Sequence, residues 1–398
     1  MSRPDVTRVE LLVNIRFPGS RAHGIQVAAM AEALSATGMN VDVVAPRRFP
    51  YREQDVFEHY GVRHTFGVQR IASLDTIDML PPRWQRAPFL LQSLTFGWRA
   101  LARMVLQRDT GVLVRDHYTM MILVNGLRRR DRARLAAEVH NLPAPGARRN
   151  RLVRALRTLP AVITISHALR DDLVAGGVAP ENVLVAHDGV HVHRYDELPD
   201  VHTARAHLQL PDMPTVAYAG QLYRWKGVDT LIEAMVELRD AQLLVVGGDG
   251  ADLHRLVDLA TRIAPGRVHF TGTVPHTAVP FHLAAGDVIA LPNSAEEEIS
   301  ARFTSPLKLF EAMATGRPIV ASDLPSLREV LEHDKNALMV QPDERMELAH
   351  GIAELLPFGE RAQRLAAQAR LDVEQYDWAV RGNQVARFLR EKLGLGGP

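Results

Sequence analysis

Lys308 and Glu311 are three residues apart and are predicted to lie on one face of a helix that begins at Ser305. Ser305 suits the N-cap, Pro306 the first helical position, and Gly316 the left-handed residue that ends the helix. Free N–H groups at such a helix start attract phosphate, and a lysine adds charge. A carboxylate one turn deeper would accept hydrogen bonds from ribose hydroxyls. The pattern indicates a site for a nucleoside diphosphate, and the alternative is a buried helix with two solvent-exposed charges.

Gly220, Arg224 and Lys226 form a second group, in a loop that follows a predicted strand. A glycine allows a ligand to approach the backbone closely. The guanidinium of Arg224 can bind phosphate oxygens with two parallel hydrogen bonds, and Lys226 adds a point charge. This loop and the Ser305 helix belong to the same predicted sheet, so both would face one crevice. Two cations and one helix start favour a diphosphate over a single phosphate.

Gly19 and His140 are the candidates in the first half of the chain. Gly19 lies with His23 on the loop after the first predicted strand, and His140 directly follows a later strand. Ligands of doubly wound sheets bind at the carboxyl ends of the strands, so both positions are suited to contact one. A single histidine is often structural, and both interpretations of His140 stay open. The loop is neither a G-x-G-x-x-G fingerprint nor a P-loop, which argues against ordinary dinucleotide or NTPase sites.

The elements that must position these residues alternate between strand and helix. Such alternation predicts an α/β protein with two doubly wound, Rossmann-like domains facing each other across a cleft. The expected strands lie at 8–15, 41–45, 112–115, 136–139, 161–165 and 183–186, and then at 214–219, 243–246, 268–271, 287–291, 319–321 and 337–340.

The domain boundaries follow from a polar, proline-containing stretch near the middle of the chain. We expect an N-terminal domain over 1–190, a linker over 191–212 and a second domain over 213–375. The last segment, 376–398, is predicted to be a helix that could pack back on the N-terminal domain.

Composition limits the classes of protein that the chain can represent. With 398 residues it is long enough for two cores, and with no cysteine it has neither disulfides nor thiolate metal sites. No apolar run approaches a membrane span, and the first ten residues lack the apolar region of a signal peptide. We therefore expect a cytoplasmic protein.

Charge is distributed unevenly between the halves. Residues 1–200 carry 27 arginines, no lysine and 20 acidic residues, a net charge of +7, against −6 for the remainder. Arginine runs at 128–134 and 148–157, with Arg99, Arg103 and Arg108 on an apolar helix, would suit an anionic membrane if they form one face. The alternative is scattered, solvated arginines. No aromatic residues interleave with the runs, which argues against nucleic acid as a partner.

These motifs together resemble the retaining, nucleotide-sugar-dependent glycosyltransferases of family 4, the group 1 type with the GT-B fold. The resemblance covers nearly the whole chain and is most specific in the second half. It rests on RFPGSRAHGIQ, EVHN, ITIS and HDGV in the first half, and on YAGQLYRWKGVDTLIEA, VVGGDG, VHFTGTV, LPNS and TSPLKLFEAMATGRPIVAS in the second.

The resemblance implies a role for each candidate residue. Arg224 and Lys226 would bind the donor diphosphate, Glu311 the ribose hydroxyls, and Val274 would lie beside the base. His140 would sit next to the transferred sugar. Further contacts to the donor would come from Gly19, Gly220, Ser305, Pro306, Leu307 and Lys308. The first domain would serve the acceptor and the second would bind the nucleotide sugar, with no metal or other cofactor required.

One position departs from the pattern of many family members. A first glutamate usually stands eight residues before the second, and here that position is Phe303. The expected activity is transfer of a hexose-type sugar to an acceptor hydroxyl, in cell-surface glycan or glycolipid synthesis. The acceptor, whether a glycan, a lipid-linked sugar or a small molecule, is not specified by the sequence. Two alternatives remain, a non-catalytic scaffold with this fold and a sugar-nucleotide epimerase.

Overall fold

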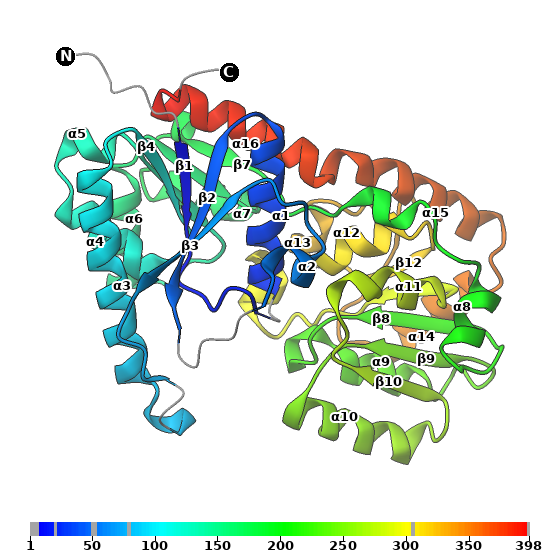
Figure 1. Cartoon of the computed structure of the whole chain (residues 1–398). Coiled ribbons are helices and arrows are strands. Elements are labelled where there is room, and N and C mark those ends of the chain that lie inside the picture. The colour runs from blue at the N-terminus through cyan, green and yellow to red at the C-terminus, as the bar shows by residue number, and fades with distance from the viewer. Residues whose placement is uncertain (1–7, 20–21, 49–53, 78–80, 304–306, 396–398) are drawn as a thin grey trace. The chain divides into compact units, whose positions relative to one another are not determined.

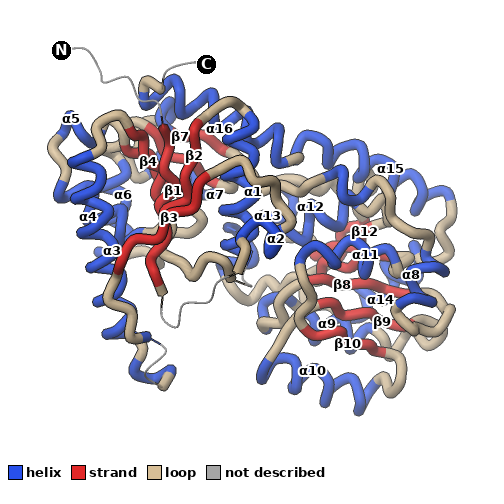
Figure 2. Tube along the Cα trace, viewed as in Figure 1, coloured by secondary structure: helices blue, strands red, loops and turns tan. Residues whose placement is uncertain are grey.

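The computed structural model describes residues 8–19, 22–48, 54–77, 81–303 and 307–395. The chain divides into two compact units, Met1–His187 with Trp378–Pro398, and Asp188–Asp377. Each unit contains one sheet with helices on both faces (Figure 1, Figure 2). All strand pairs in both sheets are parallel, so the predicted α/β fold with two Rossmann-like sheets is confirmed.

In the first unit, the described residues form a seven-stranded sheet of order β3-β2-β1-β4-β5-β6-β7. Its central strands are buried on both faces, which requires continuous apolar sequence such as the TGVLV of β4. The strands are β1 (Arg8–Leu12), β2 (Asn40–Arg47), β3 (Gly67–Ala72), β4 (Thr110–Val114), β5 (Leu135–Val139), β6 (Ala161–Thr164) and β7 (Val183–Val185).

The helices of the first unit include four elements that sequence analysis did not assign, α2, α4, α5 and α6. The full set is α1 (Ala22–Ala36), α2 (Val56–Tyr60), α3 (Arg86–Leu106), α4 (His117–Gly126), α5 (Arg129–Arg132), α6 (Ala147–Leu156), α7 (His167–Ala175) and α16 (Trp378–Leu393), with the short turns η2 (Pro82–Trp84) and η3 (Pro180–Asn182).

In the second unit, the described residues form a six-stranded sheet of order β10-β9-β8-β11-β12-β13. The strands are β8 (Thr215–Ala219), β9 (Gln242–Val246), β10 (Val268–Gly272), β11 (Val288–Leu291), β12 (Ile319–Ser322) and β13 (Leu338–Val340). The helices are α8 (Val201–His207), α9 (Val228–Ala234), α10 (Gly250–Ile263), α11 (Val279–Ala284), α12 (Leu307–Ala314), α13 (Pro325–Arg328), α14 (Arg345–Leu355) and α15 (Glu360–Asp372), with the turns η4 (Val192–Tyr195), η5 (Arg224–Lys226), η6 (His276–Ala278) and η8 (Val373–Tyr376) and the π-helix η7 (Ile299–Phe303).

Both sheets reverse their strand order once, between β1 and β4 in the first unit and between β8 and β11 in the second. At such a switch point the connections leave to opposite faces, and a crevice opens at the carboxyl ends of the strands. The loops after β1 and β8 carry Gly19 and Gly220. The fold therefore brings the two sets of sequence candidates to the switch points of their own sheets.

The C-terminal helix α16 belongs to the first unit, where it packs against α1 (Figure 1). The contact is close because residue 382 is glycine, and a Cβ there would lie 2.7 Å from the Cβ of Ala33. Arg390 fixes the far end of α16 by donating to the carbonyl of Thr37 (2.7 Å).

The stretch expected as a linker, 191–212, is folded as part of the second unit. It contains η4 and α8, and Val192, Tyr195 and Ala204 are buried in the core of that unit. Arg205 is also buried and donates to the carbonyl of Ala285 (3.0 Å). Because residues 191–212 are mostly polar, nothing in the sequence indicated that these few apolar side chains pack into the core. Separately, no helix within the described ranges combines the length and apolar character needed to cross a membrane.

Candidate functional site

The switch point of the second unit is lined by Gly220, which adopts a φ of 143° that only glycine accepts readily. A Cβ at this position would lie 3.1 Å from the hydroxyl of Tyr218 and 3.7 Å from Cδ of Lys308. Gly220 thus leaves the backbone accessible at the end of β8, directly beside a lysine of α12.

Lys308 is a buried lysine that has no carboxylate within ion-pair distance among the described residues. The residue is only 7% exposed, and its Nζ has no hydrogen-bond partner among the described residues. The ammonium lies 4.6 Å from the centroid of the Tyr218 ring. Burial, together with repulsion from Lys226, places the pKa of Lys308 well below its ordinary value. An unpaired buried cation is costly, so the site favours an anionic ligand.

Lys226 is half-buried at the end of η5, and its Nζ lies 3.9 Å from the centroid of the Trp225 ring. Burial lowers its pKa to about 8. Gly227, with a φ of 71°, closes η5 and begins α9. A side chain at residue 227 would collide with the carbonyl of Pro292, so the lysine loop is held against the end of β11.

Arg224 and Val274 lie on separate loops at the same edge of the sheet. Arg224 is exposed and forms no ion pair with any described residue, so its guanidinium is available to a ligand. Val274 follows β10 and packs, half-buried, against the hydrophobic core of the unit. Val274 thus packs against the core, and its half-exposed side chain is compatible with an apolar contact to a flat group such as a base.

Glu311 is 7% exposed, which excludes the alternative of a solvent-exposed helix charge. Its Oε1 is 2.8 Å from Nε2 of His276, two residues after Val274. The other ring nitrogen of His276, Nδ1, is buried and has no partner among the described residues. Burial and the charge of Glu311 both raise the pKa of Tyr195 well above its ordinary value. Glu311 is therefore a buried hydrogen-bond acceptor that is held in place by a histidine.

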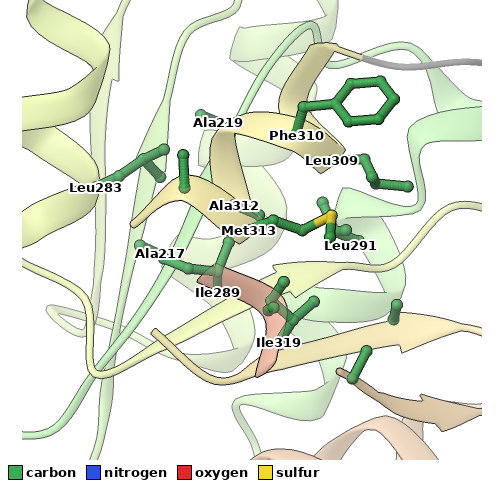
Figure 3. Close-up of a cluster of buried hydrophobic side chains, with 14 of the residues drawn as sticks. Ala217, Ala219, Leu283, Ile289, Leu291, Leu309, Phe310, Ala312, Met313 and Ile319 are labelled. Atoms are coloured by element: carbon green, nitrogen blue, oxygen red, sulfur yellow. The ribbon is translucent and has the colours of Figure 1, made fainter. Parts of the chain in front are cut away.

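Helix α12 carries Lys308 and Glu311 and is anchored by its apolar face. Leu309, Phe310 and Met313 belong to one cluster of buried apolar side chains together with Ile289 and Ile319 of the sheet (Figure 3). Gly316 has the predicted left-handed φ of 64°. The rigid core beneath the helix fixes the positions of its two charged side chains.

The beginning of this segment is described in part. Ser305 and Pro306 lie outside the described residues, and Leu307, half-buried, is the first residue of α12. Phe303, where many family members have glutamate, is 5% exposed at the end of η7. An ionised carboxylate would be poorly solvated there, which fits an aromatic residue at this position.

Asn293 is a site residue that sequence analysis did not single out, although it lies in the LPNS motif. It follows β11 at the switch point and is completely buried. Neither its amide nitrogen nor its amide oxygen has a partner among the described residues. A buried amide with both groups unpaired is unfavourable unless a ligand or water completes it. Asn293 is therefore a further candidate to contact the ligand of Lys308.

In the first unit, Gly19 is bound on both sides by the hydroxyl of Tyr60. Its N–H donates to this oxygen (2.7 Å), and the hydroxyl donates to the Gly19 carbonyl (3.0 Å). A Cβ on Gly24 would lie 2.2 Å from the same hydroxyl. Tyr60 therefore fixes the loop after β1, and this role of Tyr60 has no local sequence signal.

His140 stands at the end of β5 in a buried charge cluster. Its Nε2 lies 2.5 Å from Nη2 of Arg115 and 3.0 Å from Oε1 of Glu138. Arginine only donates and a carboxylate only accepts, so Nε2 can hydrogen-bond Arg115 when it carries no proton and Glu138 when it carries one.

Glu138 is the centre of this cluster. Its Oε1 accepts a hydrogen bond from Nη2 of Arg381 on α16 (2.8 Å), and its Oε2 lies 3.4 Å from Nε of Arg115. Burial by itself would raise the pKa of Glu138, but Arg115 and Arg381 outweigh it and hold the pKa well below its ordinary value. Arg381 also donates to the carbonyl of His187 (2.8 Å). The cluster is a compensated ion network that orients His140.

Two more histidines adjoin this network. The ring of His23 lies 6.0 Å from that of His140, and Nε2 of His23 is buried without a partner among the described residues. Burial and the charge of Arg115 lower the pKa of His23 well below its ordinary value. Burial also lowers the pKa of His117. Both rings are neutral at pH 7 and can either donate or accept a hydrogen bond. No group of three or more potential ligands suited to a metal ion occurs among the described residues.

Comparison with known families identifies the two halves of the chain separately. The family described as Glycosyltransferase Family 4 matches residues 24–194. The family described as Glycosyl transferases group 1 matches residues 213–357. Together these segments contain every described strand of both sheets except β1. The loop after β8 lies inside the second matched range, and Gly19 lies just before the first.

Curated relatives give the same class. An alpha-D-kanosaminyltransferase of Streptomyces kanamyceticus is 31% identical over 258 residues, covering 61% of this chain and 62% of the relative. A GDP-mannose-dependent alpha-(1-6)-phosphatidylinositol monomannoside mannosyltransferase of Mycobacterium tuberculosis is 32% identical over 211 residues, covering 51% and 54%. The matches thus span less than two thirds of the length of each relative.

Solved structures share the fold along nearly the whole chain. Sucrose-phosphate synthase from Thermosynechococcus elongatus has a TM-score of 0.78 at 22% identity, covering 98% of this chain and 99% of the other. HepE from Anabaena, in complex with UDP, has a TM-score of 0.73 at 19% identity, covering 96% and 100%. Two Rossmann-like units in tandem define the GT-B class. The chain belongs to glycosyltransferase family 4 within that class.

Proposed function

We propose that the protein is a retaining glycosyltransferase that moves a sugar from a nucleoside diphosphate sugar to an acceptor hydroxyl. The observation that carries this proposal is the pair Lys226 and Lys308 beside Gly220. Both ammonium groups have lowered pKa values, and neither lies within ion-pair distance of a described carboxylate. A diphosphate would supply the missing negative charge at the switch point.

The rest of the donor fits the same edge of the sheet. Glu311, fixed by His276, is an acceptor for the ribose hydroxyls, and Val274 offers an apolar contact to the base. The names of similar proteins support this class of donor. HepE was solved with UDP and with UDP-glucose, and the mycobacterial mannosyltransferase is described as GDP-mannose-dependent.

The chemistry that these residues supply is electrostatic. Departure of the nucleoside diphosphate develops negative charge, and Arg224, Lys226 and Lys308 stabilise that charge without rearranging. Because the cations belong to the protein, we propose that no metal is required, and turnover should be unchanged by excess EDTA. The first unit, with the histidine cluster around His140, serves the acceptor side of the reaction.

The proposed acceptor is a hydroxyl of a cell-surface glycan or glycolipid. The mycobacterial relative is named for a phosphatidylinositol mannoside, which supports a membrane-associated acceptor. The proposed location is the cytoplasm, with peripheral contact to an anionic membrane.

The test is acceptor-dependent release of free nucleoside diphosphate from a panel of nucleotide sugars. Arg224→Ala and Lys226→Ala should each lower turnover at least tenfold. Removal of one group that stabilises developing charge typically costs roughly a hundredfold or more. Lys335→Ala is the matched control, since Lys335 is exposed and paired with Glu332. Normal turnover in both site variants would remove the diphosphate assignment. An epimerase would interconvert sugar nucleotides without acceptor, and a scaffold would release nothing.

A further inference from the structure

Helix α3 has an unusual distribution of side chains, because it has both a buried and an exposed apolar face. One face, with Phe96, Ala100 and Met104, is buried in the core of the first unit. The other carries exposed large apolar residues, and a soluble surface helix would normally be polar there. We define the α3 ridge as Trp84, Phe89, Leu90, Leu91, Leu94 and Trp98, with exposed fractions of 63%, 37%, 43%, 44%, 46% and 61%.

The ridge is continuous rather than scattered. Leu90, Leu91, Leu94 and Trp98 fall within an arc of about 100° on the helix surface, given 3.6 residues per turn. Val105, 47% exposed, extends the same arc toward the end of the helix. Contiguous exposed apolar surface of this kind marks an interaction site.

The charges around the ridge indicate the kind of partner. Residues 82–108 contain five arginines and no acidic residue. Arg103 turns inward and donates to Glu10 (2.9 Å), so the sequence expectation that it contributes to a basic surface is wrong. Arg83, Arg86, Arg99 and Arg108 are exposed and form no ion pair with a described residue. An apolar stripe flanked by arginines and two tryptophans is the composition of a helix that lies in a membrane interface.

The two arginine runs contribute less than the sequence suggests. Arg134 is buried and donates to the carbonyl of Thr110 (2.8 Å), and Arg149 forms an ion pair with Asp172 (3.0 Å). The remaining exposed arginines of these runs lie on α5 and α6, away from the apolar stripe in sequence. The α3 ridge, and not the arginine runs, is therefore the specific evidence for a membrane-binding surface.

The ridge lies at the edge of the sheet that holds the histidine cluster. Gln92 donates to the side chain of Asn14 (2.8 Å), which places the middle of α3 level with the end of β1. The N-terminal end of α3 continues beyond the strands (Figure 1). Phe89 packs edge-on against Tyr118 (5.7 Å between ring centroids), and Tyr118 follows His117 at the start of α4.

We propose that the α3 ridge docks on the surface of an anionic lipid bilayer, with its leucines and tryptophans at the level of the headgroups and its arginines on the phosphates. Docking brings the edge of the sheet that carries His140 to the membrane. The consequence for the acceptor, that its hydroxyl is presented by a lipid-linked molecule, rests on the proposed function; the docking itself does not.

The experiment is vesicle flotation of the full-length protein with phosphatidylglycerol–phosphatidylcholine vesicles and with phosphatidylcholine alone. We expect binding to the anionic vesicles that weakens but persists at high salt. The double variant Leu94→Ser/Trp98→Ser should lower the partition coefficient at least about tenfold, because two interfacial anchors are lost. The control Val257→Ser/Leu371→Ser removes equally exposed apolar residues from the second unit and should bind as wild type.

Several outcomes would overturn the proposal. These are no binding by the wild type at low salt, equal binding by the ridge variant, or binding that depends on charge alone and vanishes at high salt. A wild-type dimer by light scattering that becomes monomeric in the ridge variant would assign the face to a second copy instead. Quenching of tryptophan fluorescence by brominated lipid, compared with Trp98→Phe, gives a test that does not depend on the double variant folding. The ridge variant should turn over the donor with a water-soluble acceptor at the wild-type rate. This result would separate loss of docking from failure of the proposed function.

Discussion

The two switch points of this protein treat buried charge in opposite ways. In the first unit, the buried carboxylate of Glu138 is surrounded by Arg115, Arg381 and His140. In the second unit, burial lowers the pKa of both Lys226 and Lys308, repulsion from Lys226 lowers that of Lys308 further, and neither lysine has a described carboxylate beside it. The charges of the Glu138 cluster are compensated within the protein, whereas those of the two lysines are not.

This difference indicates how the two sites are used. A compensated network holds a ring such as that of His140 in one orientation before any ligand arrives, which is the condition for preorganised catalysis. An uncompensated pair of cations stores unfavourable energy that an anionic ligand releases on binding. The comparison predicts opposite responses to mutation at the two sites.

The largest expected effect is on stability in the first unit. Glu138→Gln should lower the free energy of unfolding by about 3–5 kcal/mol, because it leaves two buried arginines without their carboxylate. Urea unfolding at pH 7 measures this loss. The control Asp171→Asn removes an exposed partner of Arg170 and should cost less than about 1 kcal/mol. A similarly small loss for Glu138→Gln would mean that the network is not stabilising.

In the second unit, the corresponding substitution should act in the opposite direction on stability. Lys308→Met is expected to raise the unfolding midpoint of the ligand-free protein, because an unpaired buried cation is replaced by an apolar chain. The same change should lower glycosyl transfer by about a hundred- to a thousandfold, the typical loss for one stabilising group. Lys335→Met serves as the exposed control. A lowered midpoint would show that Lys308 has a stabilising role in the free protein.

A smaller effect is expected from the ribose contact. Glu311→Gln should weaken binding of nucleoside diphosphate by about 1–3 kcal/mol, the range for a hydrogen bond to a charged group. Calorimetry with inorganic pyrophosphate provides the internal control, since pyrophosphate has no ribose and should bind both proteins equally. If both ligands lose affinity together, Glu311 acts on the phosphate site and not on ribose.

The smallest effect concerns pH. The pKa of Lys226 in the free protein is about 8, so this lysine loses its proton above that pH. A bound diphosphate favours the protonated form, and the affinity should fall above pH 8 by up to about tenfold per pH unit. The stability of the ligand-free protein should depend on pH in the opposite direction. Because the unfolded chain keeps this proton until about pH 10.5, stability should rise with pH between about 8 and 10.5. Calorimetry in buffers of different ionisation enthalpy would detect the proton uptake, and Lys226→Met should reduce it, because Lys308 remains.

Local patterns were sufficient to predict the fold and the loop and helix that carry the candidate residues of the second unit. The strand, glycine and cations of the loop 220–227 are consecutive, and Gly316 marks the end of α12 as expected. The burial of Lys308 and Glu311 could not be deduced, since helical spacing places the two on one face without saying what covers it. The partnership of Glu311 with His276 spans 35 residues and also has no local signal.

The network of the first unit was beyond sequence reasoning for the same reason. Arg381 and Glu138 are 243 positions apart, and only the tertiary fold brings them together. Arg103 illustrates a second limit. It was assigned to a basic surface with Arg99, but the buried carboxylate of Glu10 requires a cation and draws Arg103 inward. Whether a charged side chain of an apolar helix faces solvent can be decided only when the residues of the sheet beneath the helix are known.

The position of α16 has a consequence for how the chain is made. Residues 378–393 complete the first unit, yet they follow the whole second unit in the sequence. During synthesis the first 187 residues emerge without Arg381, so Glu138 lacks one of its two guanidinium partners and α1 has an uncovered face. The second unit is continuous and can fold as soon as it has emerged. The unit that is translated first is therefore the one that matures last.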